Sequence, residues 1–376
     1  MGFQAHVLRF ELEATSEIHL RHHKGSAFRG AFLHALRTDF CTNPSLRSCH
    51  VCSIHNSCPV CFLVSTTDDD NNRGVDTPRP YVIEPPLDSR EVYYPRDGLD
   101  FNVVLFSRAL SLFPYVIVAV RRMGELGLGA SRGRFILREV WAVEPLAGLQ
   151  QRVLRRGDDL VKVPNIPVEH DQVMEMATRL PRPVVPNPHS PVADSHFPVL
   201  DRHSPVADRH SLVADSHSPV ADRHSPVPNP YSLFPIPSSN IKLRFKTPLR
   251  LVTNGELVHR LSFATLMRRL FERLSTLWGA YADESLSLDF PTLLTQAELV
   301  RVAEDNTRWV ELERYSNRQQ RRMPMGGLVG DIAFEGDLAP FLPWLIWGSI
   351  THLGKYAVMG NGWYELRSEQ GVGNRE

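Results

Sequence analysis

Five cysteines within one short stretch are the residues whose spacing most directly suggests chemistry. Cys41, Cys49, Cys52, Cys58 and Cys61 form the pattern C-x7-C-x2-C-x5-C-x2-C. Two C-x2-C pairs are typical of a tetrahedral zinc–thiolate site, and a closed site with four thiolates stabilises a loop and leaves no open position for catalysis. The four ligands stay ambiguous, since Cys41 can replace Cys61. Iron–sulfur ligation and free thiols in a reducing compartment remain open alternatives.

Two glycine-rich blocks resemble each other: MGELGLGASRGRFILREV at 123–140 and HLGKYAVMGNGWYEL at 352–366. Glycine lets backbone N–H groups approach a phosphate closely, and successive N–H groups can form an anion-binding concavity. A tight turn that needs positive φ is the alternative for either block alone. Because the blocks are alike, we predict phosphate binding by Gly127, Gly129, Gly133, Gly354, Gly360 and Gly362.

Arginines accompany the glycines and could form a face that binds phosphates. Arginine binds phosphate bidentately and stacks on bases, although a solvated surface is an equally weighted interpretation. One group at the first block comprises Arg121, Arg122, Arg132, Arg134 and Arg138, and a later run comprises Arg314, Arg318, Arg321 and Arg322.

Length and composition indicate a soluble protein of two domains. The chain has 376 residues, of which 42% are hydrophobic, enough for a substantial core. Lysine plus arginine total 42, as do the acidic residues, so the net charge indicates no polyanionic partner but does not exclude a basic face. The alternating N-terminus lacks a signal peptide's apolar core, and the apolar stretch 340–350 is too short for a bilayer. We therefore expect a cytoplasmic protein without membrane association.

A repetitive insert divides the chain. Residues 190–224 contain five near-copies of a seven-residue unit that ends in histidine. Nearly every copy has a proline, which argues against a coiled coil and for disordered chain; a metal-binding histidine tract is the minor alternative. We predict an N-terminal domain at 1–150 with the cysteine-rich insertion 41–61, a low-complexity linker at 181–237, and a C-terminal domain at 238–376.

The hydrophobic pattern predicts a strand followed by a helix at the start of both parts. These elements are a strand at 7–12 and a helix at 27–40, then a strand that begins at 241 and ends near Pro248 and a helix at 261–282. A strand at 327–335, a helix at 338–351 and a glycine-punctuated terminal strand follow a polar stretch. Two β-α-β-β-α-β modules account for this count.

Several blocks resemble the repeat-associated mysterious protein superfamily, whose tandem ferredoxin-like domains bind CRISPR RNA. Both glycine-rich blocks resemble its glycine-rich loop. The sequence GDIAFEGDLAPFLPWLIWGSITHLGKYAVMGNGWYEL resembles the C-terminal signature of its precursor-processing endoribonuclease branch. HHKGSAFRGAFLHALR, the cysteines, YVIEPP and LRFKTPLRL are similar to that branch in the same order. The resemblance covers most of the chain outside the insert, and KYAVMG departs from the usual loop.

The resemblance implies an α+β fold of two tandem ferredoxin-like domains and a metal-independent endoribonuclease that cuts CRISPR repeat RNA in precursor transcripts to give guide RNAs. Attack by the 2′-hydroxyl would leave 2′,3′-cyclic phosphate and 5′-hydroxyl ends. Catalysis needs no cofactor on this route, and zinc would be structural only. The implied partners are repeat RNA and subunits of a CRISPR effector complex.

The resemblance also implies a catalytic histidine near the first helix, and His34 is the nearest match. A buried core histidine is the competing interpretation. Arg29 is the candidate cation, with His22, His23 and Lys24 just upstream. In the terminal block, Lys355 is implied to stabilise phosphate and His352 to contact RNA.

Two other classes of function remain open. The first is a non-catalytic RNA-binding subunit of a CRISPR effector complex, with the same fold. The second is a zinc-dependent structural module that binds no RNA, which the family blocks at both ends disfavour.

Overall fold

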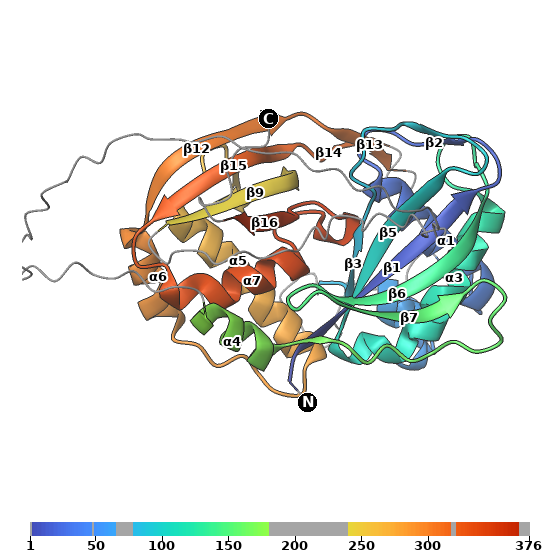
Figure 1. The fold of residues 1–376 in the computed structure, drawn as a ribbon, viewed down its shortest axis with the longest axis horizontal. Coiled ribbons are helices and arrows are strands. Elements are labelled where there is room, and N and C mark those ends of the chain that lie inside the picture. Colours follow the sequence, from blue (N-terminus) through green and yellow to red (C-terminus); the bar gives the residue numbers. More distant parts are fainter. Residues whose placement is uncertain (1, 47–48, 65–77, 180–239, 317–320, 368–376) are drawn as a thin grey trace, which may run out of the picture.

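The structure, a computed structural model, describes residues 2–46, 49–64, 78–179, 240–316 and 321–367. The predicted linker at 181–237, with its histidine repeats, lies outside the described residues. Figure 1 shows two sheets side by side, with the N-terminal half coloured blue to green and the C-terminal half yellow to red.

The N-terminal half is built on one antiparallel sheet with the strand order β3-β5-β1-β6-β7, and β8 pairs with β1. The principal elements are β1 (Gln4–Ala14), α1 (Gly25–Phe40), β3 (Tyr81–Glu84), β5 (Gly98–Phe106), α3 (Phe113–Leu126), β6 (Phe135–Glu144) and β7 (Leu149–Arg155). Shorter ones are β2 (Ile18–His19), α2 (Pro59–Val64), β4 (Val92–Tyr93), β8 (Val168–Glu169) and α4 (His170–Arg179).

The C-terminal half contains a second antiparallel sheet with the order β12-β15-β9-β16. Its main elements are β9 (Asn240–Leu249), α5 (Phe263–Tyr281), α6 (Phe290–Leu299), β12 (Arg301–Val310), β15 (Gly327–Glu335), α7 (Leu342–Thr351) and β16 (Tyr364–Arg367). Two small hairpins project from it: β10 (Val252–Thr253) with β11 (Glu256–Leu257), and β13 (Glu313–Ser316) with β14 (Arg321–Pro324).

The same arrangement of four strands recurs in both sheets. In each, the first strand of the half lies between the third and the fourth, and the second occupies the edge beside the third. This order is β6-β1-β5-β3 in the N-terminal sheet and β16-β9-β15-β12 in the C-terminal sheet. The prediction of a mixed α/β fold with antiparallel sheets is therefore confirmed.

The hydrophobic pattern located the buried elements well and missed the exposed ones. The predicted strand at 327–335 has the bounds of β15, and the predicted helix at 261–282 contains α5. The polar stretch before residue 322 holds α6 and β12, which the sequence did not reveal. Most residues of β12 are exposed at the sheet edge, so this strand has no apolar alternation to detect.

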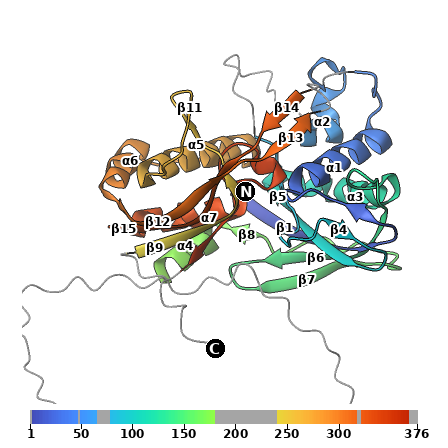
Figure 2. The same cartoon turned by 90° about the horizontal axis from the view of Figure 1, so that it is seen from above.

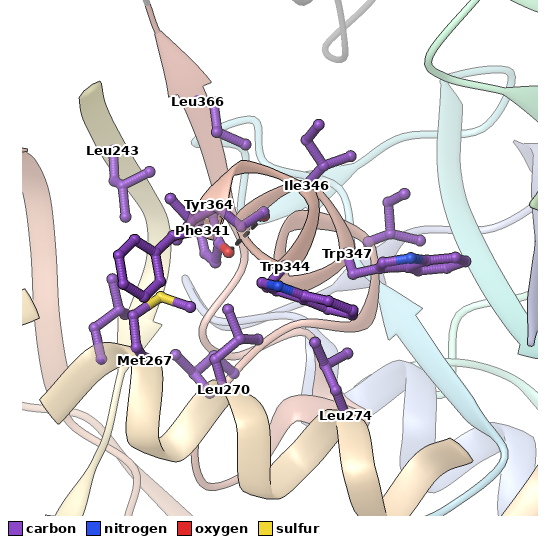
Figure 3. Packing of buried hydrophobic residues seen from close by; sticks show 14 of the residues in the cluster. Leu243, Met267, Leu270, Leu274, Phe341, Trp344, Ile346, Trp347, Tyr364 and Leu366 are labelled. Carbon is purple, nitrogen blue, oxygen red and sulfur yellow. Dashed lines mark hydrogen bonds between the residues drawn. The ribbon is translucent and has the colours of Figure 1, made fainter. Parts of the chain in front are cut away.

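One apolar core is shared by the two halves. Phe3, at the start of the N-terminal sheet, stacks on Trp278 of α5 at 4.1 Å between ring centroids and meets Trp347 of α7 at 5.1 Å. Figure 3 shows Trp344 and Trp347 of α7 packed above Leu270 and Leu274 of α5. Because burial of aromatic side chains dominates core energetics, this cluster fixes the position of one half on the other.

No helix among the described residues is long and apolar enough to cross a membrane. The most apolar helix, α7, is buried along its entire length and belongs to the shared core.

Two helical glycines give a matched test of this packing. A Cβ at Gly348 of α7 would collide with the Tyr364 hydroxyl, whereas a Cβ at Gly279 of α5 meets nothing within 4 Å. We expect Gly348→Ala to lower the free energy of unfolding by about 1–3 kcal/mol through overpacking. Gly279→Ala should leave it unchanged or raise it by up to about 1 kcal/mol, as helix propensity predicts. Urea denaturation measures both, and equal effects would contradict the α7 packing.

Candidate functional site

The first glycine-rich block connects α3 to β6 and packs on the turn after β1. A Cβ at Gly129 or at Gly133 would collide with the carbonyl oxygens of His19 and Glu17, respectively. The N–H of Gly127 donates to Met123 O at 2.9 Å, and that of Gly133 donates to Leu128 O at 3.0 Å. Close packing and turn formation therefore explain these glycines. Arg132 and Arg134, on the same loop, are exposed.

The second block connects α7 to β16 and packs where the two halves meet. A Cβ at Gly360 would lie 2.5 Å from Pro85 Cδ, and one at Gly354 would lie 2.6 Å from Arg250 O. The Gly362 N–H donates to Pro248 O at 3.0 Å, and the Gly360 N–H donates to Ala357 O at 2.8 Å. At these positions too, neighbouring chain segments approach too closely for a residue with a side chain.

The structure does not bring the two glycine-rich blocks together. Their likeness follows from topology, because each leads from a helix, α3 or α7, into the fourth strand of the arrangement that the two sheets share, β6 or β16. Figure 1 shows the α3–β6 connection at the outer end of the N-terminal sheet and the α7–β16 connection beside β3. The expectation of one cradle formed by both blocks is corrected accordingly. Four of the predicted glycine amides also donate to backbone carbonyls.

His352 is a buried link between the halves and does not face solvent. Both His352 and Glu84 of β3 have fully buried side chains, and His352 Nε2 lies 3.0 Å from Glu84 Oε1. The imidazole stacks on Trp363 at 5.5 Å. Burial lowers the pKa of His352, although Glu84 opposes this shift. The expectation that His352 contacts RNA is therefore corrected, since no ligand can reach its ring in this structure.

Lys24 is likewise structural. Its side chain is buried, and its Nζ donates to Asp88 Oδ1 at 2.7 Å and to Asp88 O at 2.6 Å. Burial of Asp88 acts to raise its pKa, but hydrogen bonds led by Lys24 hold it at about 2. The ion pair anchors the start of α1.

His34 is exposed and lies away from the terminal block. A Cβ at Gly25 would collide with Met359 O, so this side of α1 contacts the terminal loop. Nine residues, or about two and a half helical turns, separate Gly25 from His34, which places His34 on the opposite side of the helix. The competing interpretation of a buried core histidine is wrong, because the side chain is exposed. The predicted convergence of His34 with Arg29 and Lys355 is not found.

Arg29 instead meets groups from the C-terminal half. Burial lowers the pKa of Arg314 on β13, and the charge of Arg29 lowers it further, while Tyr356 raises it. The three side chains are thus electrostatically coupled at the first turns of α1. Figure 2 shows β13 and β14 beside α1. Both guanidinium groups are half-buried, and neither has an ion pair with a carboxylate among the described residues. This setting favours an anion such as phosphate.

His23, just before α1, contacts the terminal loop that carries Tyr356. The four residues His23, Arg29, Arg314 and Tyr356 are together called the junction site below. Burial lowers the pKa of His23 to about 4, and Asn361 of the terminal loop partly opposes the shift. The imidazole is therefore neutral at pH 7 and can accept a proton. The sequence placed His23 just upstream of Arg29, but it gave no reason to group them with Arg314, which is far away along the chain and is brought to Arg29 by the packing of the halves.

The remaining sequence candidates lie elsewhere. Lys355 is exposed and lines a separate pocket beside α5, with its N–H donating to Arg250 O at 2.9 Å. Arg122 is held in ion pairs with Asp39 and Glu125, and Arg138 with Glu13. Arg318 lies outside the described residues.

The cysteines lie close together but do not have the arrangement of metal ligands. Burial raises the pKa of Cys61, as do the neighbouring thiols of Cys49 and Cys58, and Cys61 also hydrogen-bonds to Cys52. All five cysteines are free thiols. Across the described ranges, no group of three or more histidine, cysteine or acidic side chains is arranged to hold a metal ion.

Comparison with known proteins identifies two family regions. Residues 243–364 match the family described as CRISPR-associated endoribonuclease Cas6, and residues 3–166 match AF_1859_N, described as an N-terminal domain. No curated protein matches the chain in sequence.

Solved structures share the fold at low sequence identity. A partial Cas6-RT-Cas1–Cas2 complex superposes with a TM-score of 0.54 at 11% identity, covering 100% of this chain and 48% of that chain. A Cas6-RT-Cas1–Cas2 complex also gives 0.54 at 11% identity, covering 100% of this chain and 30% of that chain. A Cas6 product complex gives 0.50 at 12% identity, with coverage of 96% and 100%. The chain thus spans about half the length of the first of these chains and about a third of the second.

Residues 243–364 match the CRISPR-associated endoribonuclease family, and this match agrees with the family resemblance seen in the sequence.

The protonation state of His23 can be tested through stability. The unfolded chain takes up a proton at His23 below about pH 6.5, while the folded chain does not until about pH 4. As the pH is lowered from about 6.5 to about 4, the free energy of unfolding should therefore decrease, by up to about 1.4 kcal/mol per pH unit from this residue. Urea denaturation at several pH values should show a shallower fall for His23→Gln. The adjacent exposed His22 is the control, and an equal change of slope in His22→Gln would refute the assignment.

Proposed function

We propose that the chain is a metal-independent endoribonuclease that cleaves CRISPR repeat RNA in precursor transcripts, and that its two sheets are tandem ferredoxin-like domains. The observation that carries this proposal is the coupling of Arg29 on α1 with Arg314 and Tyr356, two residues of the region that matches the family. His23, just before α1, is kept neutral by burial and contacts the terminal loop. The guide RNA produced would serve a CRISPR effector complex, whose subunits are the proposed protein partners.

The proposed chemistry is an intramolecular transesterification. His23 accepts the proton of the ribose 2′-hydroxyl, whose oxygen attacks the adjacent phosphorus and forms the 2′,3′-cyclic phosphate. The bond to the 5′-oxygen breaks, and that oxygen takes a proton from the Tyr356 hydroxyl. Arg29 and Arg314 stabilise the negative charge of the phosphorane. Exposed arginines of the first block and of β14 (Arg132, Arg134, Arg321 and Arg322) are proposed to bind RNA phosphates.

A second candidate function is a non-catalytic RNA-binding subunit. One specific observation favours it: a histidine with a pKa of about 4 is a weak base, and general-base catalysis is most efficient when the pKa lies near the working pH. The same residues would then bind the repeat without cutting it.

Cleavage of a labelled repeat transcript in EDTA separates these functions. We expect the wild-type chain to cut at one position, His23→Gln to slow the single-turnover rate by about 10²–10⁴-fold, and Arg29→Ala by about 10²-fold. The pH–rate profile should show no inflection between pH 5 and 8 from His23.

His34→Ala is the matched control, because it removes an exposed histidine from the opposite side of α1. Normal cutting by His34→Ala supports the junction site. A large loss of cleavage rate in His34→Ala together with normal cutting by His23→Gln would identify His34 as the general base. Tight binding without cleavage by the wild-type chain would establish the second function.

We further propose that the cysteine cluster takes up one zinc ion in a purely structural role. The mutual contacts of Cys49, Cys52, Cys58 and Cys61 support this, although their present arrangement lacks the ligand geometry of a metal site, as noted above. Metal analysis of protein purified with a reductant should give about one zinc per chain. Cys61→Ser should abolish zinc and lower the melting temperature, whereas Cys41→Ser should retain both. Metal-free wild-type protein of normal stability would rule the zinc out.

A further inference from the structure

A pocket opens on the helical side of the C-terminal half, away from α1. Its walls come from α5, α6, the chain between β9 and β10, and the start of the terminal glycine-rich block, with Pro78 at one edge. Its volume is about 760 Å³. Pockets of about 300–1,000 Å³ typically hold small molecules or single residues of a polymer.

The pocket is strongly basic. Cationic side chains line it from three segments, and a single carboxylate, Glu272, accompanies them. The cations are Arg250, Arg268, Arg269, Arg273 and Lys355. A concave surface lined by one sign of charge attracts ligands of the opposite sign, so the occupant must be an anion.

Three of the cations are held by protein groups. Arg269 donates to Glu272 Oε2 at 2.5 Å, Arg273 donates twice to Thr351 O at 2.6 and 3.0 Å, and Arg250 donates to Gly326 O at 2.8 Å. Arg268 and Lys355 are exposed. Within the part of the chain that the structure describes, neither of these two side chains has an ion pair or hydrogen bond. They are therefore available to an incoming anion.

The rest of the lining is apolar and partly aromatic. Phe271 and Phe290 lie with ring centroids 5.5 Å apart, and Leu251, Val252 and Leu294 complete this wall. A flat aromatic ligand can stack on such a surface, which an acidic peptide would leave unused. An anion that also carries a planar ring is a nucleotide.

We propose that this pocket binds one nucleotide of single-stranded RNA, with the base against the wall of Phe271 and Phe290 and the flanking phosphate on Arg268 and Lys355. The inference rests on the proposed function, since the RNA would be a segment flanking the cut. Lys355 is followed directly by Tyr356 of the junction site, and consecutive Cα atoms are about 3.8 Å apart. One strand can therefore pass from the pocket to the junction site.

Equilibrium binding of a fluorescein-labelled oligouridylate tests the pocket without any cleavage. We expect Arg268→Ala to weaken binding about fivefold to tenfold and to reduce the salt dependence by about 0.7 in the log–log slope, as for one lost phosphate contact. Phe290→Ala should weaken binding about tenfold through lost stacking. Lys162→Ala, which removes an exposed cation from the N-terminal half, is the charge-matched control and should bind like the wild type.

A photocrosslinking arm keeps the proposal testable if Phe290→Ala folds poorly. Oligouridylate with 4-thiouridine should crosslink to α5 or α6, and Arg268→Ala should reduce this crosslink. Wild-type affinity and an unchanged crosslink in Arg268→Ala would overturn the proposal. Displacement of the RNA by polyglutamate at equal concentration would also overturn it, in favour of an acidic peptide.

Failure of the pocket and failure of the proposed function give different results. If the chain binds oligouridylate through Arg268 but cuts no transcript in EDTA, the pocket is supported and the nuclease function is refuted. If the chain cuts the transcript but binds RNA independently of Arg268, the nuclease function is supported and the pocket is refuted.

Discussion

Burial of aromatic side chains between the two sheets is the interaction on which the other features depend. Phe3 comes from the first strand, while Trp278 and Trp347 come from two helices of the C-terminal half, and all three rings share one cluster. The buried contact between Glu84 and His352 crosses the same boundary. The halves are thereby held in one relative position, and side chains from both can form a common site without a flexible linker setting the geometry.

The terminal glycine-rich loop lies at this boundary and contacts a different region on each of its two sides. On one side its residues pack against the start of α1, where Arg29, Arg314 and Tyr356 are coupled. On the other side Lys355 reaches the basic pocket along α5. Glycine is needed because backbone from three segments approaches the loop too closely for a Cβ. In this structure the loop acts mainly by positioning its neighbours, and its glycine amides contribute turns and backbone hydrogen bonds.

Burial divides the polar residues of this region into structural and reactive groups. Lys24 and His352 are fully enclosed with carboxylate partners, so their charges stabilise the fold and are not accessible to a ligand. Arg268 and Lys355 keep their charge at the surface. His23 lies between these extremes, because burial keeps its imidazole neutral although its side chain is only partly enclosed. Desolvation and access to solvent, more than residue type, assign the roles.

The sequence by itself showed the family resemblance through its blocks. It also determined the mixed α/β class and the buried elements, such as β15 and α5, because hydrophobic periodicity reports burial directly. It also singled out Arg29 and the terminal glycine-rich block. It did not show β12, whose exposed residues have no alternation, nor the distance between the two glycine-rich blocks, whose similarity reflects equivalent positions in the two sheets. Only the tertiary structure turned His34 away from the terminal loop, enclosed His352 and joined Arg29 to Arg314 and Tyr356. Those facts depend on which side of a helix meets the other half of the molecule, and that choice is made by packing between segments far apart in the sequence.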